Sequence, residues 1–236
     1  MISIIIPAYN GARFLDSALS TIRGQEFVDI ETLLMDDGSE EKLNPPTWVR
    51  YFRLEHRGQS AARNRGIHES RGEFLAFLDI DDLWAPGHLT RLHAVFEAHA
   101  DAGIVQGRMR QLQGDRISDP YRMPYLGSCL FRREVFESCG GFDETMTLGE
   151  DHDLMYRCWE NDVVKLHVDE VSLIYRRHEG NTSRGNNVRS HVMVLKRRID
   201  RIRTGVLNPV EERRFGFRDY IGETEGASQW SDWSAS

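Results

Sequence analysis

Apolar segments of strand length alternate with helical segments through the first hundred residues, and no other feature of the sequence constrains the fold as strongly. Four segments rich in Ile, Leu, Val or Phe have the composition of buried strands: residues 2–6, 30–35, 49–54 and 74–78. Helices are predicted after three of them, at residues 14–22, 60–70 and 86–96. Strands that alternate with helices in this way form a mostly parallel sheet with helices on both faces.

The pattern changes after Gly103, where the sequence predicts shorter and less regular elements. We expect short strands near residues 104–106, 128–131, 163–168 and 173–175, and helices near residues 133–138 and 151–161. A basic amphipathic helix is predicted over residues 187–204, and residues 211–236 form a polar tail. The expected architecture is one α/β domain over residues 1–186 with a C-terminal helical extension over residues 187–236.

Three carboxylates follow the fourth apolar segment directly, in the sequence Asp79-Ile80-Asp81-Asp82. Strand alternation puts Asp79 and Asp81 on the same side, where like charges repel each other unless a cation lies between them. Mg²⁺ or Mn²⁺ fits, because both ions take oxygen ligands and bridge phosphates. The alternative is a cluster that caps the N-terminus of the following helix.

Polar segments also follow the first and second apolar segments, as Pro7-Ala8-Tyr9-Asn10 and Asp36-Asp37-Gly38-Ser39. Parallel strands end at one edge of the sheet, so these segments and Asp79 are expected to meet where open α/β sheets bind ligands. Tyr9 could stack on a base, and Asp37 could accept a hydrogen bond from a base or a ribose. Ordinary turns explain the same residues equally well.

The succession of these and later motifs resembles glycosyltransferase family 2, the inverting enzymes of the GT-A fold. The later motifs are Ala62-Arg63-Asn64-Arg65-Gly66, Gly127-Ser128, Gly140-Gly141-Phe142-Asp143-Glu144, Glu150-Asp151-His152-Asp153-Leu154 and Arg177-His178-Glu179-Gly180-Asn181-Thr182-Ser183. The likeness covers residues 2–183, and its specificity comes from the order of motifs that are weak singly. It implies a Rossmann-like GT-A domain with a nucleotide-binding half at about residues 1–103 and an acceptor half at about residues 104–186.

The resemblance also implies a role for individual residues. The residues expected to bind the nucleotide-sugar donor are Pro7, Tyr9, Asp37, Arg63 and Asp79. Asp81 and His178 would hold a divalent cation, Mn²⁺ or Mg²⁺, and Asp151 would be the catalytic base. Arg63 would either neutralise phosphate charge or brace the aspartates. Without the family context, Asp151 is better explained as an acidic residue at a helix N-terminus, and His178 as a surface histidine.

The implied reaction moves a sugar, by family habit from a UDP-linked donor, to a hydroxyl of a glycan or a lipid-linked acceptor. Two other functions remain open. A nucleotidyltransferase would share the Rossmann-like half but would need a phosphate loop, of which Asn10-Gly11-Ala12-Arg13 is a poor version. A non-catalytic nucleotide-sugar binding protein would not need both Asp81 and Asp151.

Composition narrows the partners and the location. A net charge of -7 argues against a nucleic-acid partner. The odd number of cysteines, without metal-ligand spacing, favours reduced thiols in the cytoplasm, and neither a signal peptide nor a membrane span is evident. The basic face of the 188–204 helix is either solvated or holds the protein peripherally on the inner membrane face. That face consists of Lys196, Arg197, Arg198, Arg201 and Arg203.

Overall fold

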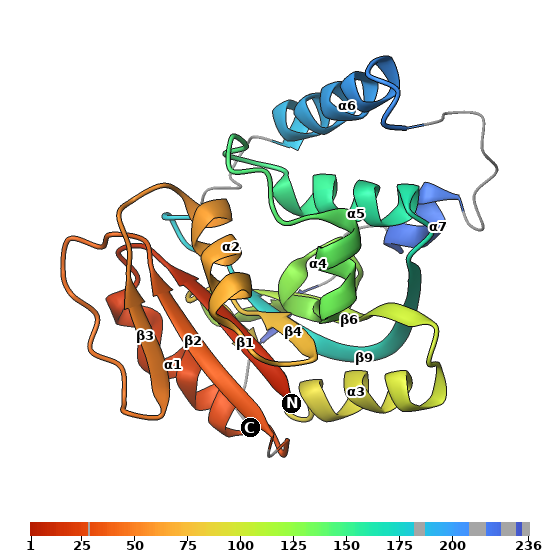
Figure 1. The fold of residues 1–236 in the computed structure, drawn as a ribbon. Helices are drawn as coiled ribbons and strands as arrows, with labels where there is room; N and C mark the ends of the chain where they lie inside the picture. Colours follow the sequence, from red (N-terminus) through yellow and green to blue (C-terminus); the bar gives the residue numbers. More distant parts are fainter. Residues whose placement is uncertain (28, 182–186, 208–215, 223–229, 233–236) are drawn as a thin grey trace.

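One curled β-sheet with helices on both faces forms the body of the computed structural model, which describes residues 1–27, 29–181, 187–207, 216–222 and 230–232 (Figure 1). The strands are β1 (Ile2–Ala8), β2 (Ile30–Asp36), β3 (Val49–Arg53), β4 (Phe74–Phe77), β5 (Leu83–Trp84), β6 (Ala102–Gln113), β7 (Arg116–Ser118), β8 (Cys129–Arg132), β9 (Val164–Arg176) and β10 (Trp230–Asp232). The helices are α1 (Ala12–Arg23), α2 (Gln59–Glu69), α3 (His88–Ala98), α4 (Arg133–Cys139), α5 (Glu150–Glu160), α6 (Asn187–Arg203) and α7 (Phe217–Ile221), with a 3₁₀ turn at Leu126–Ser128. The strand order is β10-β7-β6-β8-β4-β1-β2-β3, and β9 joins the sheet by pairing with β5 and β6.

The first four strands form the parallel part of the sheet, as their alternation with helices predicts. β1 lies between β2 and β4, so the chain leaves β1 toward one side of the sheet and later returns on the other side. The strand order therefore reverses at β1, and a crevice forms there outside the carboxyl ends of the strands. The predicted strands and helices of the first hundred residues all appear close to their predicted bounds.

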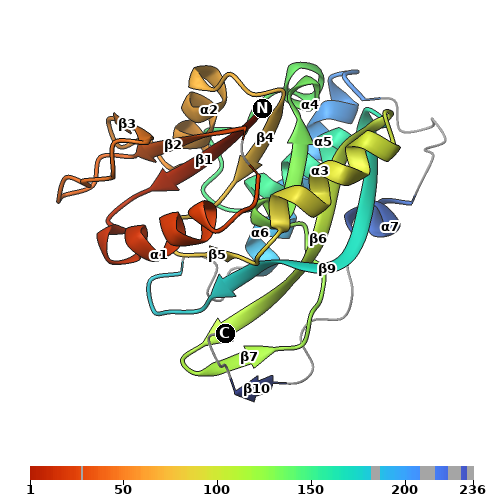
Figure 2. The same cartoon turned by 90° about the horizontal axis from the view of Figure 1, so that it is seen from below.

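Alternate residues of β1 fill two hydrophobic cores, one on each face of the sheet. Ile4 and Ile6 pack with residues of α1 and α3, whereas Ile5 packs with residues of α2, α4 and α5. Figure 2 shows α2 and α4 on one side of the parallel strands and α1 on the other. α2 approaches the sheet closely, because a Cβ at Gly66 would lie only 2.4 Å from the Ile5 side chain. This contact fixes the position of the residues that α2 carries.

The second half of the sheet is mixed, and two of its strands, β6 and β9, are longer than predicted. β8 pairs antiparallel with β4 and β6, whereas β9 runs parallel to β6. The strand predicted at residues 104–106 continues to Gln113, and the two strands predicted at residues 163–168 and 173–175 are one strand. Polar residues interrupt the apolar pattern in these segments, which are held as strands by backbone pairing between β6 and β9.

The C-terminal extension contains the predicted helix and two elements that were not predicted. α6 begins at Asn187 and lies beside α5 at the edge of the molecule (Figure 1). α7 inserts Tyr220 and Ile221 into the core beside α5, and β10 pairs with β7. The prediction of a polar tail over residues 211–236 is therefore wrong for α7, whose apolar residues pack against the domain. Residues 208–215, 223–229 and 233–236 lie outside the described part of the chain.

The predicted basic face of α6 is divided between the domain and the solvent. Arg197, Arg198 and Arg201 pair with acidic residues of the domain. Lys196 and Arg203 are exposed. These three arginines therefore satisfy carboxylates of the domain, and peripheral membrane contact through this helix stays a prediction. No helix within the described residues combines the length and the apolar character needed to cross a bilayer. The cysteines are free and buried.

Candidate active site

Every residue that the sequence predicts for donor binding, metal binding or base catalysis lines one cleft. The cleft has a volume of about 660 Å³ and lies at the carboxyl edge of β1, β2 and β4. The predicted residues in its wall are Pro7, Tyr9, Asp37, Arg63, Asp79, Asp81, Asp151 and His178. The reversal of strand order at β1 explains why loops from different parts of the chain meet at this edge.

At one end of the cleft, an aromatic stack lies beside a fixed carboxylate. The rings of Tyr9 and His56 stack with their centroids 4.2 Å apart and their planes inclined by 23°. The backbone N–H groups of Arg57 and Gly58 each donate a hydrogen bond of 2.9 Å to the carboxylate of Asp37. His56 Nδ1 lies 2.9 Å from the same carboxylate. This end therefore offers a flat surface and a rigid acceptor, which suit a planar ring with N–H donors.

Arg63 forms ion pairs with three carboxylates that line the cleft. Its side chain, 2% exposed, reaches Asp79 at 2.8 Å, Glu150 at 2.9 Å and Asp151 at 3.2 Å. Gln59 Nε2 donates a further hydrogen bond of 2.9 Å to Asp79. Burial alone would lower the pKa of Arg63, but the three carboxylates raise it, so the guanidinium stays charged. Of the two roles expected for Arg63, these contacts favour bracing the aspartates.

Asp151 lies in the first turn of α5 with its side chain 17% exposed to the cleft. Burial raises its pKa to about 8, against the opposing charge of Arg63, and the neighbouring carboxylates of Glu150 and Asp79 add to the rise. A carboxylate with a pKa near neutrality accepts protons more readily than an ordinary one. Its position in the first turn also agrees with the helix N-terminus interpretation, so placement alone does not assign the role.

Asp81 pairs directly with His178 in the wall of the cleft. The His178 Nε2 atom lies 2.9 Å from Asp81 Oδ2, and the Asn181 side-chain amide lies 3.4 Å from the same oxygen. His178 is mostly buried and packs against Phe14, with ring centroids 4.8 Å apart, so the surface-histidine interpretation is wrong. Burial raises the pKa of Asp81, and the charge of Asp79 adds to the effect.

The aspartates do not cap the following helix, which was the alternative for this cluster. α3 begins at His88 after Gly87, and its N-terminus has no side-chain cap. Asp82 instead accepts a hydrogen bond of 2.9 Å from the backbone N–H of Arg176. In the described part of the chain, no Lys or Arg side chain lies within ion-pair distance of Asp81. The partners of the Asp81 carboxylate are His178 and Asn181, whereas Arg176 donates a hydrogen bond to the backbone carbonyl of Asp81, and a cation beside this carboxylate would be stabilised.

Several contacting residues escaped the sequence prediction: His56, Gln59, Glu150 and Asn181. His56 lies in the connection that follows β3 and Gln59 begins α2, so the rule that ligands bind at the carboxyl edge could have identified this segment. The contacts of Glu150 with Arg63 and of Asn181 with Asp81 arise from tertiary packing and leave no signal in the sequence. Thr182 and Ser183, which end the last motif, lie outside the described residues.

Comparison with known proteins gives a consistent result. The sequence matches the family described as Glycosyl transferase family 2 over residues 3–149, a range that ends before Asp151 and His178. An uncharacterized glycosyltransferase from a Nostoc species is 34% identical over 167 residues, which cover 58% of this chain and 52% of the relative. The chain therefore spans about half the length of that relative.

Two solved structures resemble this fold. TarS from S. aureus in complex with UDP gives a TM-score of 0.61 at 20% identity, over 75% of this chain and 60% of that chain. The mannosyltransferase PcManGT from Pyrobaculum calidifontis, in complex with GDP-Man and Mn²⁺, gives a TM-score of 0.63 at 18% identity, over 84% of this chain and 64% of that chain. At these identities the likeness concerns the fold alone.

Proposed function

This chain belongs to glycosyl transferase family 2 and has the GT-A fold of glycosyltransferases, and from that premise we propose that it moves a sugar from a nucleoside diphosphate donor to an acceptor hydroxyl with inversion. The observation that carries the proposal is the single cleft that contains Asp37, Asp81 and Asp151. Such a transfer requires a site for the nucleobase, a site for the cation and a proton acceptor within one cleft.

Donor binding is proposed at the end of the cleft formed by Tyr9, His56 and Asp37. The stacked rings provide a surface for the nucleobase, and the fixed carboxylate of Asp37 accepts an N–H of the base. Pro7 and Asp79 line the path from this end toward the middle of the cleft, where the ribose and the diphosphate would lie. UDP-sugars are the first candidates, because uracil has one N–H flanked by carbonyl groups and TarS was solved with UDP.

Proton removal is proposed at the carboxylate of Asp151. As the acceptor oxygen bonds to the anomeric carbon, the bond from that carbon to the diphosphate breaks, and the hydroxyl proton passes to Asp151. The products are the glycosylated acceptor and a nucleoside diphosphate. A single base opposite the leaving group suits one in-line displacement, which inverts the anomeric carbon. The raised pKa of Asp151 supports this role.

A divalent cation is proposed between Asp81 and His178. The carboxylate of Asp81 and the imidazole of His178, which lie 2.9 Å apart, form a donor pair that suits Mn²⁺ or Mg²⁺. Within the described residues, no group of three or more His, Cys, Asp and Glu side chains is arranged to hold a metal ion. Two protein ligands suit an ion that takes its remaining ligands from water and the diphosphate. Such an ion would stabilise the charge that develops on the leaving diphosphate.

The acceptor is proposed to enter beside the aromatic pair Tyr125 and Tyr175, whose ring centroids lie 5.0 Å apart. Both residues line the same cleft, together with Met123 and Pro124. Flat aromatic faces and apolar neighbours suit a sugar ring or a lipid-linked glycan better than a charged acceptor.

Product analysis tests the reaction type. We expect slow turnover of one or more nucleotide sugars to release nucleoside diphosphate in the presence of Mn²⁺, and a suitable glycan acceptor to accelerate it. Chromatography of the nucleotide products measures this directly. Release of pyrophosphate would indicate a nucleotidyltransferase instead. Binding of nucleotide sugars without turnover under any acceptor condition would support a non-catalytic binding protein.

Thermal stability tests the proposed cation site. Mn²⁺ added with UDP should raise the melting temperature of the protein by more than either one alone, because ligands that bind the native state stabilise it by about 2.7 kcal/mol at a hundred times their Kd. The Asp81→Asn variant should lose the Mn²⁺-dependent part and keep the part that UDP produces alone. Asp115→Asn, at an exposed turn between β6 and β7, is the matched control and should behave as the wild type. An unchanged Mn²⁺ response in Asp81→Asn would place the ion elsewhere.

A further inference from the structure

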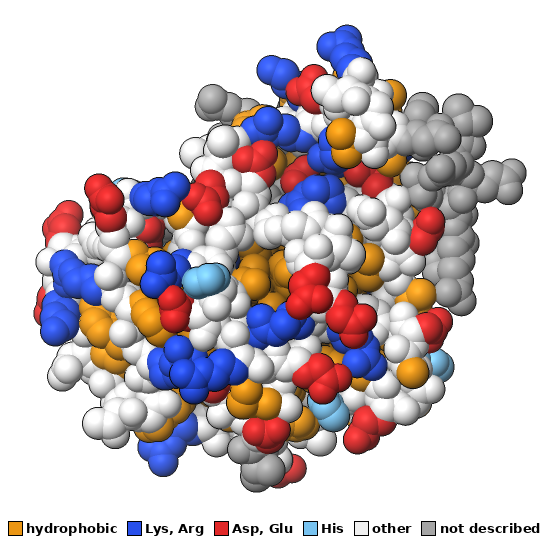
Figure 3. All heavy atoms as spheres, in the orientation of Figure 1, with side chains coloured by type: hydrophobic (Ala, Val, Ile, Leu, Met, Phe, Trp, Pro, Cys, Tyr) orange, Lys and Arg blue, Asp and Glu red, His pale blue; other side chains and the backbone are white. Residues whose placement is uncertain are grey.

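α6 turns its apolar face away from the domain. Val192, Leu195 and Ile199 lie on one side of the helix, and these residues are 59%, 48% and 47% exposed. We call these residues the outer stripe. Within the described part of α6, Val194 is the buried hydrophobic residue. Figure 3 shows hydrophobic side chains beside Lys and Arg side chains at the α6 end of the molecule, at the top of the view. Amphipathic helices of globular proteins normally face the other way.

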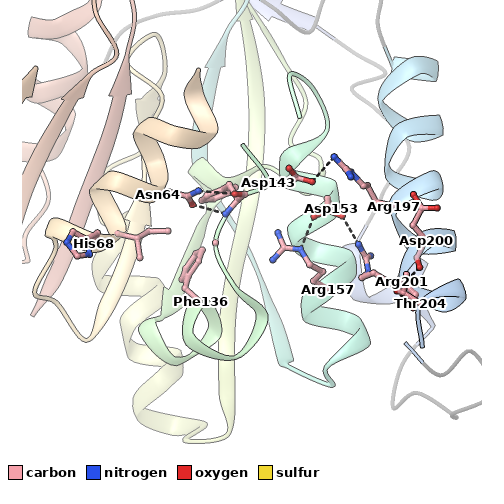
Figure 4. Close-up of a pocket in the computed structure, with 13 residues that line it drawn as sticks. Asn64, His68, Phe136, Asp143, Asp153, Arg157, Arg197, Asp200, Arg201 and Thr204 are labelled. Carbon is pink, nitrogen blue, oxygen red and sulfur yellow. Dashed lines mark hydrogen bonds and ion pairs between the residues drawn. The ribbon is translucent and has the colours of Figure 1, made fainter. Parts of the chain in front are cut away.

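Ion pairs on the inner face fix this orientation. Arg197 binds Asp143 at 3.0 Å, and Arg201 binds Asp153 at 3.0 Å (Figure 4). Arg201 also pairs with Glu160 at 2.8 Å, and Arg198 pairs with the same carboxylate at 3.2 Å. Rotating the helix to bury the outer stripe would break these contacts and remove both arginine partners of Glu160, whereas Asp153 would keep its ion pair with Arg157. The outer stripe is therefore held toward the outside.

The inner face of α6 contributes little apolar packing against the domain. A cavity of about 690 Å³ separates α6 from α2 and α4, and it is lined by the paired arginines and aspartates together with Phe136 and Phe142 (Figure 4). Helices in proteins gain most of their stability by burying an apolar face. The ion pairs with the buried carboxylates of Asp153 and Glu160 hold α6 in place, but they bury little apolar surface. α6 would thus gain substantially from a partner that covers the outer stripe.

Cations flank the outer stripe. Lys196 and Arg203 follow Val192 and Ile199 by four residues, so they lie next to them on the same side of the helix, and both are exposed. A helix of this length is about 25 Å long at 1.5 Å per residue. Aliphatic residues beside exposed cations characterise helices that lie in the interface of a bilayer containing anionic lipids.

We propose that α6 docks on an anionic lipid bilayer. The outer stripe would lie at the boundary between the headgroups and the acyl chains, and Lys196 and Arg203 would contact lipid phosphates. A second copy of this chain fits less well. A stable protein interface buries about 800 Å² on each partner, which three half-exposed aliphatic side chains do not supply. In a symmetric pair, the flanking cations of the two copies would also face each other.

Docking through α6 would hold the mouth of the cleft close to the lipid surface. Arg197 contacts both Asp143 and Thr145, in the loop between α4 and α5. The next residues of that loop, from Met146 to Gly149, line the cleft. An acceptor carried in the membrane could therefore present its hydroxyl group close to the site without leaving the bilayer.

Vesicle co-sedimentation of the full chain, without donor or acceptor, tests the docking independently of any transfer activity. We expect the wild type to bind vesicles that contain phosphatidylglycerol, to bind pure phosphatidylcholine vesicles more weakly, and to lose binding as salt is raised. The triple variant Val192→Ser, Leu195→Ser, Ile199→Ser should bind about tenfold more weakly, with an unchanged melting temperature because these side chains are exposed. Trp48→Ser, an exposed hydrophobic residue outside α6, is the matched control and should bind as the wild type.

Charge reversal tests the contribution of the cations Lys196 and Arg203 separately from that of the outer stripe. Lys196→Glu with Arg203→Glu should weaken binding to phosphatidylglycerol vesicles about tenfold, whereas Lys42→Glu with Arg71→Glu makes the same change in net charge and should not. Equal binding by wild type and triple variant, or absence of wild-type binding, would overturn the proposal. Light scattering could also overturn the proposal, by showing that the wild type is a dimer and the triple variant a monomer. The outer stripe would then be an interface between copies of this chain.

Discussion

Asp151→Asn is expected to slow sugar transfer by about a hundredfold to ten-thousandfold while leaving nucleotide binding intact. Asparagine has nearly the same shape as aspartate, but it cannot accept the proton of the acceptor hydroxyl. The donor contacts proposed for Tyr9 and Asp37 lie on other loops of the cleft and should not change. Single-turnover transfer rates and the Kd for UDP, measured on both proteins, check the two halves of this prediction.

Glu144→Gln is the matched control for this substitution. Glu144 lines the same cleft, but its carboxylate pairs with Arg57 at 2.9 Å and lies outside the cluster around Arg63. We expect this variant to keep most of the transfer rate. If Asp151→Asn retained a comparable rate, Asp151 would be a helix N-terminal residue and the base would have to be sought elsewhere in the cleft.

The pH dependence of transfer should carry the signature of the same carboxylate. Burial raises the pKa of Asp151 to about 8, and a general base acts only when it is deprotonated. kcat/KM should therefore fall as the pH decreases through a midpoint well above the ordinary carboxyl range. In Asp151→Asn, the remaining activity should no longer show that step.

The sequence predicted the first half of the fold well because three of its strands, β1, β2 and β4, are buried on both faces. Such strands need continuous apolar runs, and the residues 2–6 and 74–78 are clear examples. β6 and β9 carry polar residues and are held by pairing with each other, which is a contact between segments distant in sequence. Periodicity within a window cannot detect that contact, so the predicted strands in this half were too short.

The sequence likewise predicted only part of the site. Asp37 and Asp79 follow buried strands directly, so the rule for parallel sheets placed them at one edge. The bracing role of Arg63 was only one of two alternatives, because it depends on how closely α2 packs on β1 and on where α5 begins. The outward apolar face of α6 was not predictable at all, since the sequence shows an amphipathic helix but not which face the domain takes.

Arg63→Gln is expected to lower the free energy of unfolding by about 3–5 kcal/mol, the typical cost of removing one partner of a buried ion pair. The substitution leaves Asp79, Glu150 and Asp151 close together without their counter-charge. Arg57→Gln is the matched control: Arg57 is 67% exposed and pairs with Glu144, so its loss should cost about 0–1 kcal/mol. Urea unfolding of both variants measures the difference.

The pH dependence of this loss distinguishes a charge effect from a packing effect. Without Arg63, the ionised carboxylates of Asp79, Glu150 and Asp151 repel one another, and protonation in acid relieves this repulsion. Groups with a raised folded-state pKa contribute stability that is fully present at pH values below the unfolded pKa and is lost as the pH rises through the folded pKa. The deficit of Arg63→Gln should therefore be larger at neutral pH than in mild acid. A deficit that is independent of pH would mean that Arg63 acts through its packing against Phe142, with the guanidinium 5.4 Å from the ring centroid, and not as the cation that keeps three acidic residues in one cleft.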